Sequence, residues 1–403
     1  MKAEKEDLLT GIQVLDLADE KASFCSKLLA DLGARVIKIE RPGGDSSRKI
    51  GPFLRGVPNP ERSLFFYHNN TNKLGITLNL EHEDGKEIFL KLLKKTDIVI
   101  ETFRPNYLRQ IGLGFDVLSR MNPKLILVSV TGFGENGPRS QYESCDLVAS
   151  AYGGQMYVSG SPSTPPLKSF GEQSYYTASL FAAIGILIAL RKRAHTGRGE
   201  HMDISLQESV ASTLDHVMVR YFYDRIIPKR QGNLSWNHFS FILPCKDGHI
   251  HLTISTQWET LIEWIASEGM AEDLMDEKWK DEEYRLRNID HVMDILQRWT
   301  RTHSVQELFE LGQLMRFPWA PVYSLKEVLN NAQLQAREFF IDVEHPEIGT
   351  SLKYPGAPYK FSRYSSDRWK RAPLIGEDNV QIYQGELGLS DEELQRLSSL
   401  KVI

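Results

Sequence analysis

The chain has 403 residues, of which 41% are hydrophobic and 25% are charged, as is usual for a globular protein with a substantial buried core. Its formal net charge of -5 at pH 7 gives no electrostatic reason to expect a nucleic acid or an anionic membrane as a partner. Three cysteines, far apart and without a C-x-x-C pair, favour a reducing compartment, so we expect a cytoplasmic protein.

The first hundred residues predict two consecutive β-α-β units. Apolar runs and helical spacing alternate in the order that favours parallel strand pairing. The expected strands cover residues 12–16, 34–39, 74–80 and 97–100, and the expected helices cover 23–32 and 85–95. This order indicates one half of a Rossmann-like sheet.

A glycine-bearing loop marks the next strand as a candidate ligand site. Residues 125–130 form a β-rich run that leads into Thr131-Gly132-Phe133-Gly134. Open α/β sheets bind ligands at the carboxyl ends of their strands. A strongly helical segment follows over residues 177–194, with Gly197 as its expected stop. Its apolar part, residues 178–190, is too short for a membrane span and is typical of a buried helix.

Several familiar chemistries lack their motifs. The sequence contains no G-x-x-x-x-G-K-S/T, no G-x-G-x-x-G after the first strand and no G-x-S-x-G. The closely spaced histidines have neither H-E-x-x-H spacing nor a third ligand nearby, so no metal site is expected. The residue patterns alone therefore predict a two-domain α/β protein with a ligand site and leave its chemistry open.

Ordered sequence blocks along nearly the whole chain carry a family resemblance. They are GIQVLD at 11–16, LADLGARVIKIERPG at 29–43, NK at 72–73, DIVIETFRP at 97–105, GFG at 132–134, AAIGIL at 182–187, TGRG at 196–199, APV at 320–322, HPEIG at 345–349 and APLIGE at 372–377. In this order they resemble the class III CoA-transferases, which include formyl-CoA transferase, carnitine CoA-transferase and α-methylacyl-CoA racemase.

The resemblance implies an α/β architecture and an obligate dimer. A Rossmann-like large domain is built from both chain ends, a smaller α+β domain is inserted, and two subunits interlock like linked rings. We expect residues 1–200 and 331–403 to form the large domain, 201–225 to form a linker helix and 226–330 to form the small domain.

The resemblance also implies a site for coenzyme A, which serves as a thioester substrate without any tightly bound cofactor. Arg41 matches the family's arginine for the CoA phosphates, a role that suits the fixed donor fork of a guanidinium. Leu78, Thr102 and Phe103 match positions beside the adenine and pantetheine, although the family has asparagine where this chain has Thr102. Arg104 is a further cation for the phosphates.

The family's catalytic aspartate is missing. In active members it lies six residues before the aromatic residue of the A-A-I-G-I-L helix, which is Phe181 here, and that position holds Tyr175. A phenol with a pKa near 10 is protonated at neutral pH and cannot form the acyl anhydride. Glu172, three residues out of register, is the one nearby carboxylate that could replace it. Asp146 matches another aspartate of the family, and we expect its side chain to form hydrogen bonds with the backbone.

We therefore expect the non-catalytic subunit of a heterodimer or heterotetramer whose homologous partner carries the aspartate. The complex would move CoA from an acyl-CoA, with succinyl-CoA a candidate, to a carboxylic acid, with the aromatic acid benzylsuccinate a candidate. Met156, Tyr157, Tyr175 and Tyr176 could line the acid's pocket or simply pack. Two alternatives stay open: an active homodimeric transferase, racemase or lyase that uses Glu172, and a CoA-binding regulator.

Overall fold

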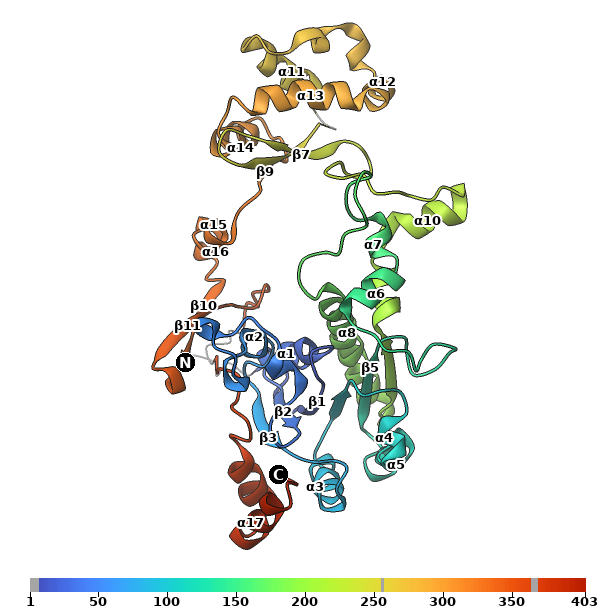
Figure 1. Cartoon of the computed structure of the whole chain (residues 1–403), viewed down its shortest axis with the longest axis vertical. Coiled ribbons are helices and arrows are strands. Elements are labelled where there is room, and N and C mark those ends of the chain that lie inside the picture. The colour runs from blue at the N-terminus through green and yellow to red at the C-terminus, as the bar shows by residue number, and fades with distance from the viewer. Residues whose placement is uncertain (1–6, 255–256, 364–368) are drawn as a thin grey trace. The chain divides into compact units, whose positions relative to one another are not determined.

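The computed structural model describes residues 7–254, 257–363 and 369–403, and the chain divides into two compact units. The first unit contains Met1–Gln155, Lys168–Arg225 and Arg337–Ile403, so both ends of the chain belong to it (Figure 1). The second unit contains Met156–Leu167 and Ile226–Ala336. The expected fold class, a large α/β domain from both chain ends with a smaller inserted domain, is confirmed.

A six-stranded parallel sheet organises the first unit. Its strand order is β3-β2-β1-β4-β5-β6, so the chain first builds outward from β1 and then crosses back to β4. The carboxyl ends of β1 and β4 meet where the direction of winding reverses, which is the position that open α/β sheets use for ligands. The strands are β1 (Gln13–Leu17), β2 (Arg35–Glu40), β3 (Leu74–Thr77), β4 (Ile98–Glu101), β5 (Ile126–Thr131) and β6 (His201–Ser205).

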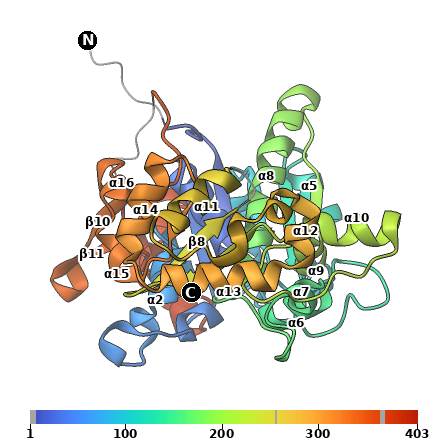
Figure 2. The ribbon, with the colours of Figure 1, turned by 90° about the horizontal axis from the view of Figure 1, so that it is seen from above.

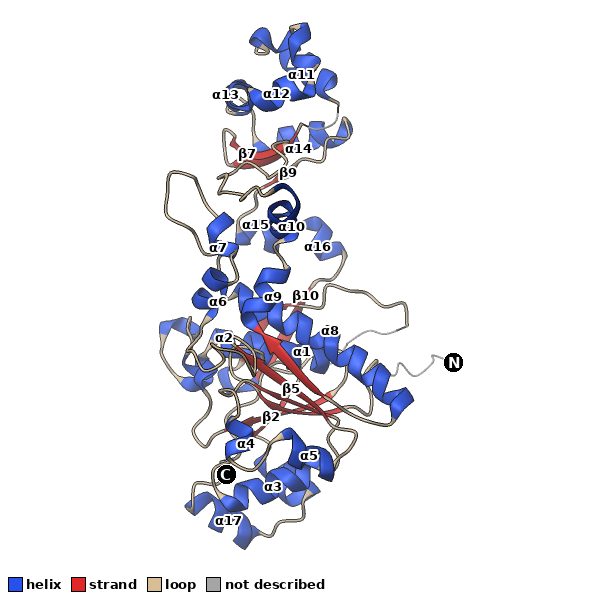
Figure 3. Cartoon of the chain, turned by 90° about the vertical axis from the view of Figure 1, so that its right-hand side faces the viewer, coloured by secondary structure: helices blue, strands red, loops and turns tan. Residues whose placement is uncertain are grey.

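Helices cover both faces of this sheet (Figure 3). Successive strand residues point to opposite faces, so Val14 packs with α1 (Ser23–Asp31) and α8 (Gln173–Thr196). Leu15 packs on the other face with α3 (Glu83–Leu93) and α5 (Phe115–Met121). Two apolar layers of this kind explain why β4 and β5, near the middle of the sheet, are almost continuous hydrophobic runs in the sequence.

The long helix α8 is apolar enough and long enough to cross a membrane by composition and length alone. Its alanine-rich inner face, which includes Ala178, Ala182 and Ile186, is fully buried against the sheet. A core helix of a globular protein meets the same criteria. The helix begins four residues before the expected position and ends at Gly197, whose φ of 70° suits glycine.

Residues 201–225, expected as one linker helix, form a strand and two helices instead. Residues His201–Ser205 pair in parallel with β5, and α9 (Leu206–Ser212) and α10 (Asp215–Asp224) follow. The physical reason is the two-residue period of Met202 and Ile204, which both pack against the core under α8. The polar residues between them face outward and conceal this strand from a prediction based on hydrophobicity.

The C-terminal segment protects the edge of the sheet at β3. Backbone N–H groups of Gly75 and Thr77 donate to the side chains of Asp378 and Asn379 at 2.7 and 2.9 Å. Helix α17 (Asp391–Ser399) then lies beside α3 (Figure 1) and packs Leu397 into the same core. An edge strand whose donors are satisfied in this way cannot pair with another chain.

The remaining elements are short. In the first unit they are α2 (Leu64–Asn69), α4 (Tyr107–Gln110), α6 (Asp146–Tyr152), β10 (Phe340–His345) and β11 (Thr350–Pro355), and α7 (Gln155–Val158) lies at the boundary between the units. Strands β10 and β11 form an antiparallel hairpin.

The second unit has its own aromatic core. Strands β7 (Ser240–Pro244), β8 (His249–Thr253) and β9 (Ala320–Pro321) form an antiparallel sheet. Figure 2 shows its helices around β8, and Trp299 and Trp319 are buried among them. These helices are α11 (Trp258–Ser267), α12 (Glu282–Arg287), α13 (Ile289–Thr300) and α14 (Val305–Leu314). The unit also contains α15 (Leu325–Leu329) and α16 (Ala332–Ala336), which bury none of their residues.

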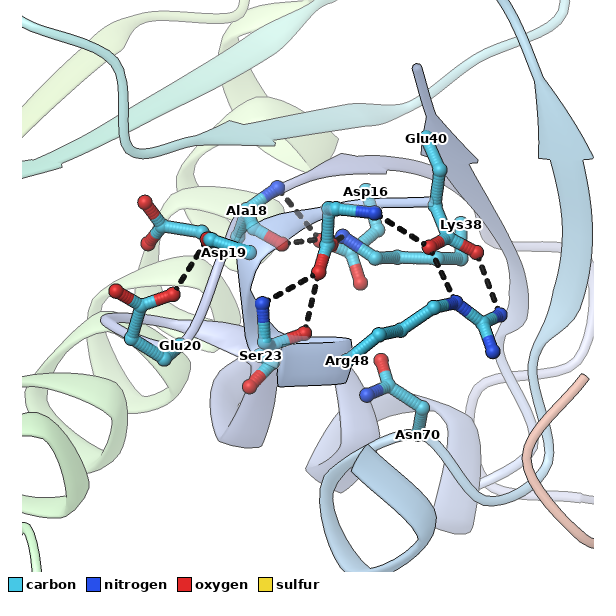
Figure 4. A network of polar contacts seen from close by, with 12 residues as sticks. Asp16, Ala18, Asp19, Glu20, Ser23, Lys38, Glu40, Arg48 and Asn70 are labelled. Carbon is cyan, nitrogen blue, oxygen red and sulfur yellow. Dashed lines mark hydrogen bonds and ion pairs between the residues drawn. The ribbon is translucent and has the colours of Figure 1, made fainter. Parts of the chain in front are cut away.

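A buried ion pair joins the end of β2 to the loop that follows it. The Arg48 guanidinium donates to both oxygens of Glu40 at 2.6 and 2.7 Å, and Figure 4 shows the two side chains pointing toward one another. Arg48 also donates to the carbonyl of Pro373 at 2.9 Å, which ties this loop to the C-terminal part of the chain. Both side chains are almost fully buried.

We expect Arg48→Ala to lower the free energy of unfolding by about 3–5 kcal/mol, because Glu40 would be left as a buried charge without its partner. Urea denaturation would measure the loss. The matched control is Arg396→Ala, since Arg396 pairs with Asp84 at the surface and such pairs contribute about 0–1 kcal/mol. Equal losses in the two variants would show that the buried pair stabilises the fold no more than a surface pair does.

Candidate functional site

A cavity of about 280 Å³ lies at the carboxyl ends of β1 to β4, and we call it the strand-end pocket. Its position coincides with the reversal of strand order, where the sheet offers loops rather than paired strands. It is lined by Leu17, Asp19, Ile39, Glu40, Arg41, Gly44, Asp45, Ser46, Leu78, Asn79, Leu80, Glu81, Thr102, Phe103 and Tyr107.

Four of the five residues predicted for CoA line this pocket. Arg41, Leu78, Thr102 and Phe103 come from three different strand ends, and the parallel sheet brings them together. Arg104 is exposed and is not among the lining residues. Because no ligand contact is observed, the CoA-binding role of these five residues stays a prediction.

One wall of the pocket is built from polar and aromatic contacts. The Thr102 hydroxyl accepts the backbone N–H of Asp19 at 2.9 Å and so joins the end of β4 to the turn after β1. The rings of Phe103 and Tyr107 lie 4.7 Å apart at an angle of 40°. This wall combines an aromatic surface with groups that could bond a ligand.

Buried Glu101 holds the turn that carries Phe103. One of its carboxyl oxygens accepts the backbone N–H of Phe103 at 2.7 Å, directly after β4. Burial raises the pKa of Glu101 to about 8, so this carboxyl group is mostly protonated at neutral pH. The rigid turn fixes the aromatic ring at the pocket.

The floor of the pocket is held by buried charges. Beneath it, the Lys73 ammonium donates to Asp16, Ser26 and Asn70 at 2.7–2.9 Å. Lys38 pairs with Asp45 at 2.6 Å. Figure 4 shows the Lys38 side chain beside the Glu40 and Arg48 pair. Burial lowers the pKa of Lys73, but its acceptors keep the ammonium bonded on several sides.

The pocket includes residues that the sequence did not single out. Glu81 and Tyr107 line it beside Arg41, and the Tyr107 hydroxyl donates to Glu81 at 2.8 Å. Tyr107 lies at the beginning of α4, four residues after Phe103, and this short separation is a signal that could have found it. Glu81 lies three residues after Leu78, but no spacing pattern assigns it to this cavity.

Tyr175 lies in the first turn of α8, and its hydroxyl group has a structural partner. This oxygen accepts the backbone N–H of Asp146 at 3.0 Å, at the beginning of α6, and the side chain is buried. Burial, followed by the nearby charge of Glu20, raises the pKa of the phenol above its usual value. Tyr175 is therefore neutral at physiological pH and engaged with the backbone.

Asp146 completes a reciprocal link between α6 and α8. Its carboxylate accepts both the backbone N–H and the hydroxyl of Ser174, at 2.8 and 2.6 Å. Its other oxygen lies 2.7 Å from the Lys168 ammonium. The expectation that Asp146 bonds backbone agrees with this geometry.

Tyr175 and Tyr176 lie at a narrow hollow in the first unit. Its other lining residues are Glu20, Phe24, Phe65, Asn69 and Glu172, and it has no room for a water molecule. Burial and the negative charge of Asp146 raise the pKa of Glu172. The four residues predicted for the acid's pocket are divided, since Met156 and Tyr157 belong to the second unit. Their role in substrate binding stays a prediction.

Comparison with known proteins gives matches along nearly the whole chain. The sequence profile of CoA-transferase family III covers residues 9–379. A Thauera aromatica protein, succinyl-CoA:(R)-benzylsuccinate CoA-transferase subunit BbsE, is 34% identical, with 92% of each chain covered. The succinyl-CoA–L-malate CoA-transferase beta subunit of Chloroflexus aurantiacus is 32% identical, with 98% of each covered. Formyl-CoA:oxalate CoA-transferase of Streptomyces coelicolor is 33% identical, with 98% of this chain and 99% of that protein covered.

Solved structures agree in fold. A CAIB/BAIF family protein from Brucella suis superposes with a TM-score of 0.83 at 28% identity and covers 94% of this chain and 98% of its own. Rv3272 of Mycobacterium tuberculosis has a TM-score of 0.79 at 23% identity, with 93% of this chain and 99% of its own covered. The second likeness concerns the fold alone.

We expect Tyr175→Phe to lower the free energy of unfolding by about 1–3 kcal/mol, because the buried N–H of Asp146 would lose its acceptor. Thermal or urea denaturation would measure the change. Tyr142→Phe is the matched control, since the Tyr142 side chain is 60% exposed and its change should stay within about 0.5 kcal/mol. Indistinguishable stabilities for the Tyr175 variant and the wild type would contradict a structural role for this hydroxyl.

Proposed function

The chain belongs to CoA-transferase family III, and from this premise we propose that it is the non-catalytic subunit of a heteromeric CoA-transferase. A homologous subunit that bears the family's aspartate supplies the nucleophile. The observation that carries the proposal is Tyr175, which stands six residues before Phe181, where the family has that aspartate, and whose hydroxyl oxygen accepts the backbone N–H of Asp146.

The reaction needs a carboxylate at this position. An aspartate attacks the thioester carbonyl, the thiolate of CoA leaves and a mixed anhydride forms. The thiolate then attacks the aspartyl carbonyl, which releases the first acid as its carboxylate and leaves an aspartyl-CoA thioester. The acceptor carboxylate attacks this thioester, the thiolate leaves and a second mixed anhydride forms. The thiolate finally attacks the acceptor carbonyl, which gives the new acyl-CoA and frees the aspartate. A buried, protonated phenol offers no oxygen that can enter this exchange of acid anhydride and thioester.

Exposed apolar surface on two helices supports a partner subunit. Along α8, opposite its buried face, Leu180, Phe181, Ile184, Leu187 and Ile188 are exposed at helical spacing. Helix α10, which the structure describes in full, buries none of its residues and exposes Met218, Val219, Tyr221, Phe222 and Tyr223. Apolar patches of this kind mark interaction sites, and we assign them to an interlocked dimer with the homologous subunit.

The names of the relatives support this assembly and its substrates. Two of them are named as subunits, and their names give succinyl-CoA with benzylsuccinate or with malate. We therefore assign succinyl-CoA as the donor and a carboxylic acid, with benzylsuccinate as the first candidate, as the acceptor, in the cytoplasm. Enzymes of this family use CoA thioesters as substrates, and we place the CoA of this chain in the strand-end pocket.

The competing assignment makes Glu172 the nucleophile of an active homodimer. Glu172 carries a carboxylate, and burial raises its pKa. However, the hollow that it lines has no room for water, much less for a thioester. Its position directly before α8 is also three residues from the position that the family uses.

Glu172→Gln separates the two assignments. This chain is co-expressed with an aspartate-bearing homologue from the same genome, and succinyl-CoA-dependent CoA transfer is measured. We expect the glutamine variant to retain turnover close to that of the unmodified heteromer. Replacement of the homologue's aspartate by asparagine is the matched change and should abolish turnover. Loss of activity in the Glu172 variant, with a folded complex, would contradict the proposal.

Tyr175→Asp should not restore activity to this chain by itself. An aspartate there would face the charges of Glu20 and Glu172, the same groups that raise the pKa of Tyr175. The substitution would also remove the phenol oxygen that accepts the backbone N–H of Asp146. Steady-state assays with succinyl-CoA and candidate acids would check this, and turnover equal to that of active family members would contradict it.

A further inference from the structure

Among the described residues, Arg41 is the one cation that lines the strand-end pocket, and it already has a partner. Arg41 lies 3.0 Å from Glu81, and both side chains are more than half exposed, at 64% and 54%. The Tyr107 hydroxyl donates to the same Glu81 oxygen at 2.8 Å, which orients the carboxylate at the pocket. The arginine expected to grip phosphate is therefore held by a carboxylate of the same cavity.

The other charges that the structure describes at the pocket offer no substitute. Four carboxylates line it, those of Asp19, Glu40, Asp45 and Glu81. The cations that neutralise the first three are used within the protein. Lys21 pairs with Asp19, Arg48 with Glu40 and Lys38 with Asp45. Lys38 and Arg48 are also almost fully buried, so a phosphate entering the pocket can reach Arg41 only in competition with Glu81.

We propose that Glu81 sets the affinity of this chain's own pocket for CoA and makes that affinity low. The inference rests on the proposed function, in which the partner subunit carries out the covalent steps. The phosphates of CoA must displace Glu81 from Arg41, and the carboxylate then stays close to them as a like charge. A subunit without a nucleophile thereby leaves acyl-CoA to the subunit that can use it.

The size of the effect follows from the exposure of the pair. Exposed ion pairs contribute little free energy, so a phosphate can displace Glu81 from Arg41 at a small cost. Repulsion between a carboxylate and a phosphate a few ångströms apart in a mainly aqueous setting changes binding about three- to tenfold. Salt screens such exposed charges, so the effect should shrink as ionic strength rises.

Isothermal titration of the purified chain with CoA tests the proposal. Glu81→Gln keeps the shape of the side chain and removes its charge, so we expect CoA to bind about three- to tenfold more tightly than to the wild type, with a smaller gain at high salt. Glu83→Gln is the matched control, since Glu83 is exposed, pairs with Lys86 and does not line the pocket. A Glu81→Gln variant that also carries Arg41→Ala should lose the gain.

Equal or weaker binding to the Glu81 variant, an equal gain in the Glu83 control, or no measurable binding to either protein would overturn the inference. None of these results bears on which subunit forms the covalent adduct, so the proposed function would survive them. Conversely, an adduct on this chain would end the proposed function while the titration still reported on Glu81. Melting curves of the variants confirm that each protein titrated is folded.

Discussion

Buried charges must be paired, and this constraint shapes the carboxyl-end edge of the main sheet. Lys73 with Asp16, Arg48 with Glu40 and Lys38 with Asp45 lie under or beside the strand-end pocket and fix the loops that form it. The Arg48 pair also ties the C-terminal part of the chain to the N-terminal strands, since Arg48 donates to the carbonyl of Pro373. The buried cations next to the pocket are therefore already paired within the protein.

Buried polar groups are paired in the same way at the beginning of α8, where the proposed function places the missing aspartate. Two hydrogen bonds join α6 to α8 there. The backbone N–H of Asp146 donates to the Tyr175 hydroxyl, and the backbone N–H of Ser174 donates to the Asp146 carboxylate. A neutral phenol fits this buried position beside Glu20 and Glu172. The family's fold persists in the chain, and in the proposed function the position for covalent chemistry is part of the scaffold.

Much of the fold could be predicted because its strands are buried on both faces. Residues 12–16 and 34–39 are mostly apolar, and they match β1 and β2 within a residue or two. The strand His201–Ser205 was missed because its polar residues interrupt the hydrophobic pattern. The sequence motif located Tyr175, but the bond to Asp146, 29 residues away, and the pair of Arg41 with Glu81, 40 residues apart, are tertiary contacts that no local pattern specifies.

The most direct test of the central claim is intact-mass spectrometry of the purified heteromer after incubation with succinyl-CoA. Each subunit is weighed separately, before and after treatment with hydroxylamine, which cleaves an activated acyl bond. We predict an adduct on the aspartate-bearing subunit and an unchanged mass for this chain. An adduct on this chain that hydroxylamine removes would contradict its non-catalytic role and would direct attention to Glu172.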